Sequence, residues 1–165
     1  MYSMRAQLPV QLSRARQCTY GSVAALAVWS KNANWIGYVA ISNDETSKRL
    51  GRRDITISWR GTVTRLEWIA DLMDFLHPIS SNKIPCPDPN VKVEYGFLDL
   101  YTDKDENCRY CKFSAREQIL TEVKRLVEKY PNEKMSITVT GHSLGSALAI
   151  LSAHDIVTNL ESIII

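Results

Sequence analysis

One segment limits what this chain can fold into more than any other, because a run of β-branched residues leads directly into a Gly-x-Ser-x-Gly sequence. The run covers residues 137–140 (Ile-Thr-Val-Thr), and Gly141, Ser143 and Gly145 follow it. β-Branched residues favour a strand. A glycine two residues before the serine and another two after it let a strand and the next helix approach more closely than larger side chains allow. The segment therefore predicts a strand, a sharp turn that carries Ser143, and a helix.

A serine on such a turn is typical of the nucleophile in α/β-hydrolases. By itself, the pattern also fits an ordinary glycine-rich turn between a strand and a helix. A second feature favours the first interpretation. The strand-like residues 55–59 end in Arg60-Gly61-Thr62, upstream of the serine, where this fold takes its first oxyanion-hole donor. Both features together indicate a serine hydrolase that forms an acyl-enzyme.

Composition bounds the size of the core and excludes some classes of function. The chain has 165 residues, of which 45% are hydrophobic, so it can bury one substantial core but not two. The net charge of +2 is spread over segments of mixed sign, which argues against a nucleic-acid partner. No run of about 18 apolar residues occurs, so the sequence predicts no transmembrane helix, and any membrane contact would be interfacial.

The N-terminal part differs in composition from the rest. Residues 1–43 contain no Asp or Glu, and arginine and lysine supply positive charge among Ser, Ala and Gln. Such a composition is typical of an organelle transit peptide, and a poorly structured leader is the alternative. We therefore expect two parts: a basic, acid-poor leader over residues 1–28, and a partial hydrolase domain over residues 29–165.

The four cysteines form no recognisable disulfide or metal-binding pattern. Cys108 and Cys111 make a single C-x-x-C, and a zinc site would need two more ligands. Cys86 and His77 are the candidates, but a proline-rich stretch separates them from the pair. We therefore expect reduced thiols and no metal site. The sequence also lacks a phosphate-binding glycine loop, so it predicts no cofactor.

Alternating hydrophobic patterns predict an α/β fold. Strands are expected at residues 35–41, 54–59 and 135–139, and helices at residues 64–76, 114–130 and 144–157. The first two strands could pair with each other. Ser114 and Glu117 form a capping box at the start of the second helix, and three prolines predict a loop over residues 79–90. The order of elements favours a mainly parallel sheet flanked by helices.

Four motifs, in this order along the chain, resemble the class 3 (fungal lipase-like) lipase family. They are Trp59-Arg60-Gly61-Thr62, Trp68-Ile69-Ala70-Asp71-Leu72, Tyr95-Gly96-Phe97-Leu98 and Thr140-Gly141-His142-Ser143-Leu144-Gly145. More narrowly, residues 29–156 are similar to the plant chloroplastic phospholipase A1 group of gamma type. The resemblance implies an α/β-hydrolase fold that is incomplete, with truncation on its C-terminal side.

The resemblance assigns roles to individual residues. It makes Ser143 the nucleophile that attacks an ester carbonyl. The backbone N–H groups of Thr62 and Leu144 match the oxyanion hole. Asp71 stands where a carboxylate would orient the Thr62 hydroxyl, and from its place on a helix it also fits a solvated carboxylate on an exposed face.

Residues 63–71 match the family's lid, a short amphipathic helix that moves at a lipid surface. Leu66, Trp68 and Ile69 would then contact lipid, whereas their spacing alone favours core packing. The implied substrate is an acyl glycerolipid, with phospholipase A1, galactolipase and triacylglycerol lipase activities as the range and the sn-1 acyl chain as the preferred site of cleavage. The implied location is the chloroplast, with the cytoplasm as the alternative.

The resemblance also implies a triad acid and a triad histidine well beyond Ser143, and we expect this chain, which ends at Ile165, to lack both. His154 would lie about 16 Å along the helix from the serine at 1.5 Å per residue, too far for proton transfer. His142 adjoins the serine, but its expected role is packing or hydrogen bonding at the turn. No motif places His77 at the serine.

Three alternatives to a hydrolase that acts with these 165 residues alone follow from this expectation. The first is an inactive, truncated homologue that binds lipid or pairs with an intact relative through the unpaired edge of the serine-bearing strand. The second is an intact phospholipase whose natural sequence continues past Ile165. The third is an acyltransferase, in which an acceptor other than water captures the acyl-enzyme.

Overall fold

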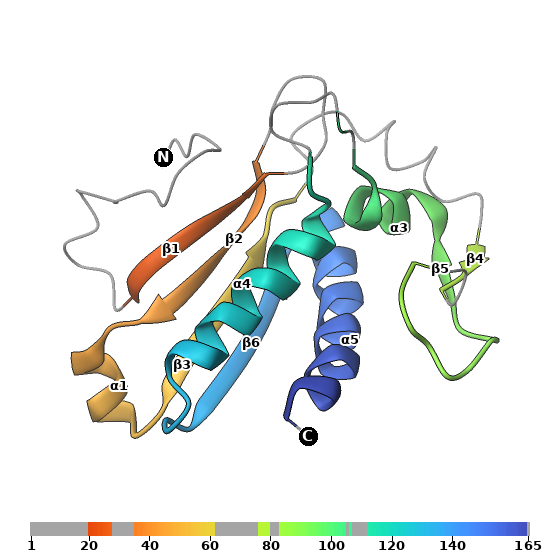
Figure 1. Cartoon of the computed structure of the whole chain (residues 1–165). Coiled ribbons are helices and arrows are strands. Elements are labelled where there is room, and N and C mark those ends of the chain that lie inside the picture. The colour runs from red at the N-terminus through yellow and green to blue at the C-terminus, as the bar shows by residue number, and fades with distance from the viewer. Residues whose placement is uncertain are drawn as a thin grey trace.

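The computed structural model describes residues 20–27, 35–61, 76–79, 83–104, 106 and 112–164. In chain order the elements are β1 (Tyr20–Ala27), β2 (Trp35–Ser42), α1 (Asp44–Leu50), β3 (Arg53–Trp59), β4 (Leu76–Pro78), β5 (Lys92–Glu94), α3 (Tyr95–Thr102), α4 (Ala115–Lys129), β6 (Met135–Gly141) and α5 (Leu144–Ile164). Helix α4 lies in front of the larger sheet in Figure 1, with α5 beside it. The α/β class that the sequence predicts is therefore confirmed.

The larger sheet has the strand order β1-β2-β3-β6. Strand β2 pairs antiparallel with β1 and with β3, whereas β3 and β6 run parallel, from Arg53 opposite Met135 to Trp59 opposite Gly141. The described sheet is thus mixed, and the mainly parallel sheet that the sequence predicts is found only at β3 and β6. The connections explain the difference, because α1 and its caps are too short for a parallel crossover, while α4 lies in the long connection from β3 to β6.

Helix α1 forms between the first two predicted strands, where the sequence analysis predicts no helix or strand. The side chain of Asn43 accepts a hydrogen bond from the Thr46 N–H at 2.8 Å, which caps the first turn. The helix ends at Gly51, whose φ of 70° lets its N–H reach the Ser47 carbonyl. Acidic residues in the first turn and basic residues in the last add to these signals. These local signals were therefore present in the sequence.

Helix α4 confirms the sequence prediction for residues 114–130 almost to the residue. The Ser114 hydroxyl accepts from the Glu117 N–H at 3.1 Å, and the Glu117 carboxylate accepts from the Ser114 N–H at 2.8 Å. This is the capping box that the sequence indicates. Ile119, Val123 and Leu126 follow at helical spacing and are buried. One face of α4 therefore packs into the core.

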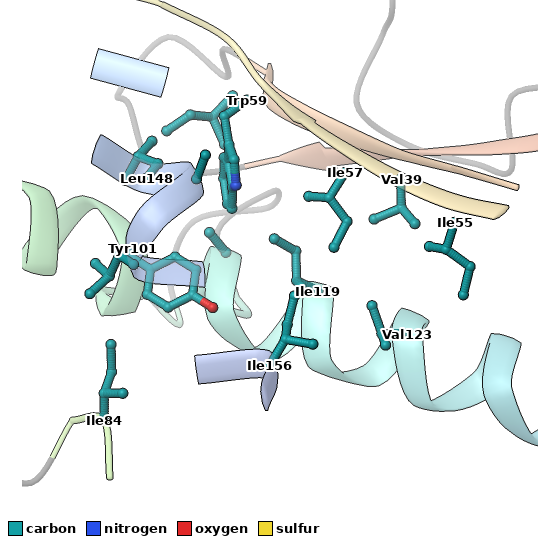
Figure 2. Packing of buried hydrophobic residues seen from close by; sticks show 14 of the residues in the cluster. Val39, Ile55, Ile57, Trp59, Ile84, Tyr101, Ile119, Val123, Leu148 and Ile156 are labelled. Carbon is teal, nitrogen blue, oxygen red and sulfur yellow. The ribbon is translucent and has the colours of Figure 1, made fainter. Parts of the chain in front are cut away.

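The core lies between the larger sheet and the helices α4 and α5. Strand β3 alternates buried and half-buried residues, and its Ile55, Ile57 and Trp59 point toward the helices (Figure 2). Ile119 of α4 and Leu148 of α5 meet them from the other side, and all five side chains are buried. Burying one such aliphatic side chain stabilises the fold by about 1.5–3 kcal/mol, so this layer holds α5 against the sheet.

Strand β6 forms one edge of the described sheet, where it pairs with β3. Its residues are half-buried or exposed, whereas the short apolar pattern of residues 135–139 favours a buried strand. The difference arises because a strand at a sheet edge is covered on fewer sides than one in the middle. Within the described residues, the unpaired edge that the sequence analysis expects on the serine-bearing strand is thus present.

The segment after β3 departs from the sequence predictions. The expected helix at residues 64–76 lies largely outside the described residues, and its last residue, Leu76, begins β4. Strand β4 pairs antiparallel with β5 to form a second, two-stranded sheet. The described part of residues 79–90 contains no helix or strand, in agreement with the predicted loop. Helix α3 follows β5 directly and was not predicted.

The larger sheet begins inside the segment that the sequence sets apart as a leader. Strand β1 occupies residues 20–27 and pairs along its length with β2. The boundary between residues 28 and 29 therefore does not separate the sheet from what precedes it, and a leader role stays a prediction for the residues before β1. Among the helices that the structure describes, none combines the length and apolar character that a membrane span requires.

Candidate active site

The predicted serine lies on a strained turn between β6 and α5. Strand β6 ends at Gly141 and helix α5 begins at Leu144, so two residues make the turn. Ser143 has a φ of 56°, and among the described residues no other side-chain-bearing residue has a positive φ. Such backbone conformations cost about 1–3 kcal/mol and concentrate at functional sites. The turn that the Gly-x-Ser-x-Gly pattern predicts is therefore formed, with Ser143 exposed at its tip.

The glycines around the serine are required by close backbone contacts. A Cβ atom on Gly141 would overlap the Gly145 carbonyl. A Cβ atom on Gly145 would lie 2.6 Å from the Trp59 carbonyl oxygen, and one on Gly61 would lie 2.9 Å from that of His142. Distances below 3.0 Å do not occur at real Cβ atoms. The end of β3 therefore touches the turn in a way that only glycine permits.

Two further hydrogen bonds shape the first turn of α5. The Gly145 N–H donates to the His142 carbonyl at 3.0 Å, and the Ser146 N–H donates to the Ser143 carbonyl at 2.8 Å. Leu144 opens the helix, where N–H groups have no acceptor within the helix itself and carry partial positive charge. This is the position that the sequence analysis assigns to one oxyanion-hole donor.

The remaining predicted site residues lie between residues 62 and 71, outside the part of the chain that the structure describes. They are Thr62, Leu66, Trp68, Ile69 and Asp71, and the predicted lid, residues 63–71, lies there as well. The described residues before this stretch end at Gly61, which approaches the turn closely. Their assignments as oxyanion hole, lipid contact and support for the Thr62 hydroxyl stay predictions.

An acidic residue follows the serine in α5, but its carboxylate is fully used in packing. Asp155 is completely buried. Arg116 donates to both of its oxygens at 2.8 and 2.9 Å, Tyr101 donates its hydroxyl at 2.9 Å, and Asn159 donates its amide at 2.9 Å. Burial, followed by the nearby Asp155 charge, raises the pKa of Tyr101 well above its usual value. Asp155 therefore joins α3, α4 and α5 and is not available to orient a catalytic histidine.

No histidine ring hydrogen-bonds to Ser143 within the described residues. His154 lies in the middle of α5, and its Nε2 is buried without a hydrogen-bond partner. His77 lies in the exposed strand β4, where its ring is 5.0 Å from that of Tyr95. His142 is exposed beside the serine. The expectation that this chain lacks the triad acid and histidine stays a prediction.

A cavity of about 640 Å³ lies at the other end of the sheet from the serine. Two of its lining residues are buried: Ser47 of α1 and Arg53, the first residue of β3. The Arg53 guanidinium donates to the two carboxylate oxygens of Glu133 at 2.8 and 2.7 Å, to Asp44 at 2.9 Å and to the Ser42 carbonyl at 2.8 Å. Its carbon also lies 4.0 Å from the centre of the Tyr130 ring. We call these five residues the Arg53 cluster.

The charged groups of the Arg53 cluster pair with one another, and the cluster does not extend the candidate site. The hydrogen bonds with Glu133 raise the pKa of Arg53 and lower the pKa of Glu133. No local pattern in the sequence predicts this cluster, because Arg53 and Glu133 are 80 positions apart. Within the described residues, no group of three or more metal-binding side chains gathers anywhere.

Comparison with known proteins agrees with this geometry. The family model for lipase (class 3) matches residues 56–163, which include the end of β3, the serine turn and most of α5. The chain belongs to the class 3 lipase family. This membership carries with it the α/β-hydrolase fold, in which a nucleophilic serine lies between a strand and a helix.

Curated relatives come from plants. Phospholipase A1-Igamma2, chloroplastic, from Arabidopsis thaliana is 74% identical over 133 residues, which cover 78% of this chain and 25% of the relative. Phospholipase A1-Igamma1, chloroplastic, from the same plant is 72% identical over 134 residues, covering 78% of this chain and 26% of the relative. Phospholipase A1 EG1, chloroplastic/mitochondrial, from Oryza sativa subsp. indica is 55% identical over 131 residues, with 77% and 30% covered. The chain thus spans about a quarter to a third of the length of these relatives.

Proposed function

We propose that this chain carries the nucleophile and the oxyanion hole of a carboxylic ester hydrolase that acts on acyl lipids, of the phospholipase A1 type. The observation that supports this most strongly is the backbone of Ser143, which is held at a positive φ between β6 and α5 by glycine contacts. A fold keeps such strain only where its surroundings impose it. The names of the relatives, phospholipases A1, point to the same chemistry.

In the proposed reaction, the Ser143 oxygen attacks the carbonyl carbon of an acyl ester while its proton passes to a base. The negative oxygen of the tetrahedral intermediate accepts hydrogen bonds from the N–H groups of Leu144 and Thr62. The intermediate collapses, the lysolipid leaves with a proton, and the acyl group stays on Ser143. Water then attacks the acyl-enzyme, releases the fatty acid and restores the serine. In the described part of the chain, no ring of His77, His142 or His154 hydrogen-bonds to Ser143 to serve as this base.

The contact with lipid belongs to the same proposal. Leu66, Trp68 and Ile69 would enter the interface as a lid opens, and Asp71 would orient the Thr62 hydroxyl toward the oxyanion. The substrates would be polar acyl glycerolipids cleaved at sn-1, in keeping with the phospholipase A1 names. A chloroplast location follows from the same relatives, which are named chloroplastic.

A second candidate function is supported by the histidines. Because no histidine ring hydrogen-bonds to Ser143 within the described residues, the chain could bind lipid, or an intact relative at the open edge of β6, without hydrolysing anything. Without its base, a comparable serine hydrolase loses a factor of ~10⁶ in turnover and keeps ~10³ to 10⁴ over water. The two candidates therefore differ by a rate that is easy to measure.

The test is hydrolysis of p-nitrophenyl butyrate and of phosphatidylcholine vesicles by the purified protein. Ser143→Ala is the active-site variant, and Ser136→Ala, at the other end of β6, is the matched control. We expect turnover in the wild type and the control and none in Ser143→Ala. Equal background rates in all three proteins would contradict hydrolysis by this chain. Co-flotation with the vesicles would then support lipid binding as its function.

A further inference from the structure

A buried hydrogen bond joins the end of β3 to the middle of α5. The indole N–H of Trp59 donates to the Ser152 hydroxyl at 2.8 Å. Trp59 is 3% exposed and Ser152 is fully buried, so water cannot replace either partner. The Ser152 hydroxyl in turn donates to the Ala149 carbonyl at 3.2 Å. The bond therefore connects the side chain of the last β3 residue with the backbone of α5.

A second contact joins the same two elements closer to the serine. Gly145, in the first turn of α5, lies directly against the carbonyl groups of Trp59 and Arg60. Ser152 is seven positions beyond Gly145 in α5. This separation is about two helical turns or 10 Å, so both positions face β3 from the same side of the helix. Two contacts at this separation determine both the distance and the tilt of α5 relative to the strand.

The Trp59 ring is itself held from a third direction. Tyr101 of α3 meets it edge to face, with ring centres 5.9 Å apart and an angle of 70° between the rings. Figure 2 shows the two rings beside Leu148 of α5. The Tyr101 hydroxyl donates to Asp155, one turn beyond Ser152 on α5. The indole therefore has one fixed orientation, in which its N–H points at Ser152.

These contacts matter because they join α5, which begins at the proposed oxyanion-hole donor Leu144, to the end of β3. Gly61, just beyond this strand end, lies against the His142 carbonyl of the serine turn. On the other side of β3, the Arg60 N–H donates to the Ile36 carbonyl at 2.7 Å and holds the strand end to β2. Any rotation of α5 about its contact at Gly145 would move Leu144 and the serine turn relative to the end of β3.

We infer that Trp59 and Ser152 are positioning residues, whose hydrogen bond sets the position of the Ser143 turn and of the Leu144 N–H relative to the end of β3. This inference rests on the proposed function. Neither side chain touches the substrate, and both act through the backbone of β3 and α5. Removing an oxyanion donor outright costs about 10²- to 10³-fold in rate, and a displacement of 1 Å can cost about 10²-fold. We therefore expect loss of the Trp59–Ser152 bond to cost about tenfold.

The test compares Ser152→Ala with Ser47→Ala. Ser47 is also buried in a helix and hydrogen-bonded, to Ser42 at 2.7 Å, but it lies in α1 at the opposite end of β3. The first measurement is the rate at which a fluorophosphonate probe labels Ser143, with Ser143→Ala as the blank. We expect about tenfold slower labelling in Ser152→Ala and an unchanged rate in Ser47→Ala, although both variants lose stability.

The second measurement does not need a reactive serine. Hydrogen exchange of the Gly145 and Ser146 amides reports the turn bonds to His142 and Ser143. We expect both amides to exchange about tenfold faster in Ser152→Ala and at the wild-type rate in Ser47→Ala, measured where neither variant unfolds globally. Trp59→Phe should have the same effect, and the double variant should add little to either single change.

The outcomes separate the inference from the function on which it rests. A wild type that the probe does not label would contradict the proposed nucleophile, and amide exchange would still decide whether Ser152 positions the turn. Exchange at Gly145 and Ser146 that is unchanged in Ser152→Ala would overturn the inference, whatever the labelling shows. Additive effects of Trp59→Phe and Ser152→Ala would overturn it as well.

Discussion

The two ends of the parallel pair β3–β6 are built in different ways. At the amino end, the buried Arg53 guanidinium is surrounded by hydrogen-bond acceptors and an aromatic ring. At the carboxyl end, contacts are made by backbone atoms and glycines, and the exposed Ser143 keeps a strained φ. The amino end satisfies its charges within the fold, whereas at the carboxyl end the described residues offer no hydrogen-bond partner to the Ser143 hydroxyl or to the Leu144 N–H. The first arrangement contributes stability, and the second suits chemistry.

The largest expected effect is that of Gly145→Ala at the carboxyl end. The new Cβ would lie 2.6 Å from the Trp59 carbonyl oxygen, so the strand and the helix must separate. We expect labelling of Ser143 to fall about 100-fold and the free energy of unfolding to fall by about 1–3 kcal/mol. Probe labelling and urea unfolding measure the two effects. Wild-type labelling by this variant would show that the close contact is not needed.

Asp155→Ala has the next largest expected effect on the labelling of Ser143 and a larger effect on the free energy of unfolding, and it tests whether a buried ion pair supports α5. Asp155 is fully buried, and its loss leaves Arg116 without its partner. Breaking such a pair costs about 3–5 kcal/mol in unfolding free energy. The control is Glu122→Ala, which removes the exposed pair with Arg125 and should cost about 0.5 kcal/mol. Similar urea midpoints for both variants would contradict the buried role. The effect of Asp155→Ala on the labelling of Ser143 should be smaller than that of Gly145→Ala.

Arg53→Met tests the amino end. The change keeps an apolar chain beside Tyr130 but removes the hydrogen bonds to Glu133 and to the Ser42 carbonyl. We expect a loss of about 2 kcal/mol in unfolding free energy, with unchanged labelling of Ser143. Arg52→Met is the control, since Arg52 is about half exposed and pairs with Asp54 at the surface. A strong loss of labelling in Arg53→Met would show that the two ends are coupled.

Gly51→Ala is the matched counterpart of Gly145→Ala. Gly51 also requires glycine, but through its φ of 70° and not through contact, because a Cβ there would meet nothing within 4 Å. An alanine in this conformation costs about 1 kcal/mol. We expect a small shift in the urea midpoint and wild-type labelling. An effect as large as that of Gly145→Ala would contradict the distinction between strain and close contact.

The smallest expected effect is a pH dependence at the amino end. The hydrogen bonds from Arg53 lower the pKa of Glu133. A carboxylate whose pKa is lower in the folded state stabilises the fold above its unfolded pKa of about 4.3, and this contribution is lost as pH falls through the folded pKa. Glu133→Gln should therefore unfold more easily than the wild type at pH 7, and the difference should shrink below about pH 4. A constant difference in urea midpoint would contradict this origin.

The sequence predicted those elements whose signals are local. The capping box at Ser114 and Glu117, the β-branched run of β6 and the glycines around Ser143 each specify structure within a few residues, and all three were confirmed. Helix α1 carried equally local caps that the sequence analysis did not use. Strands β4 and β5 are three residues each and too short for a periodic pattern to identify.

The candidate site was predictable only in part. The residue types and spacing around Ser143 sufficed to predict the turn that carries the proposed nucleophile, because the turn itself requires them. The hydrogen bond between Trp59 and Ser152 spans 93 positions and gives no periodic signal. The same holds for Arg116 and Asp155, which are 39 positions apart. Such pairs depend on how helices cross the sheet, which local patterns do not specify.

The sequence by itself determined the strand, turn and helix around Ser143, since short-range sterics at glycine and β-branched residues leave few other conformations. It also determined the family, through motifs whose order survives in the chain. Tertiary structure alone decided that the sheet is mixed and that Asp155 is used for packing. These outcomes depend on long-range contacts, in which a residue's role is determined by partners that the fold brings to it.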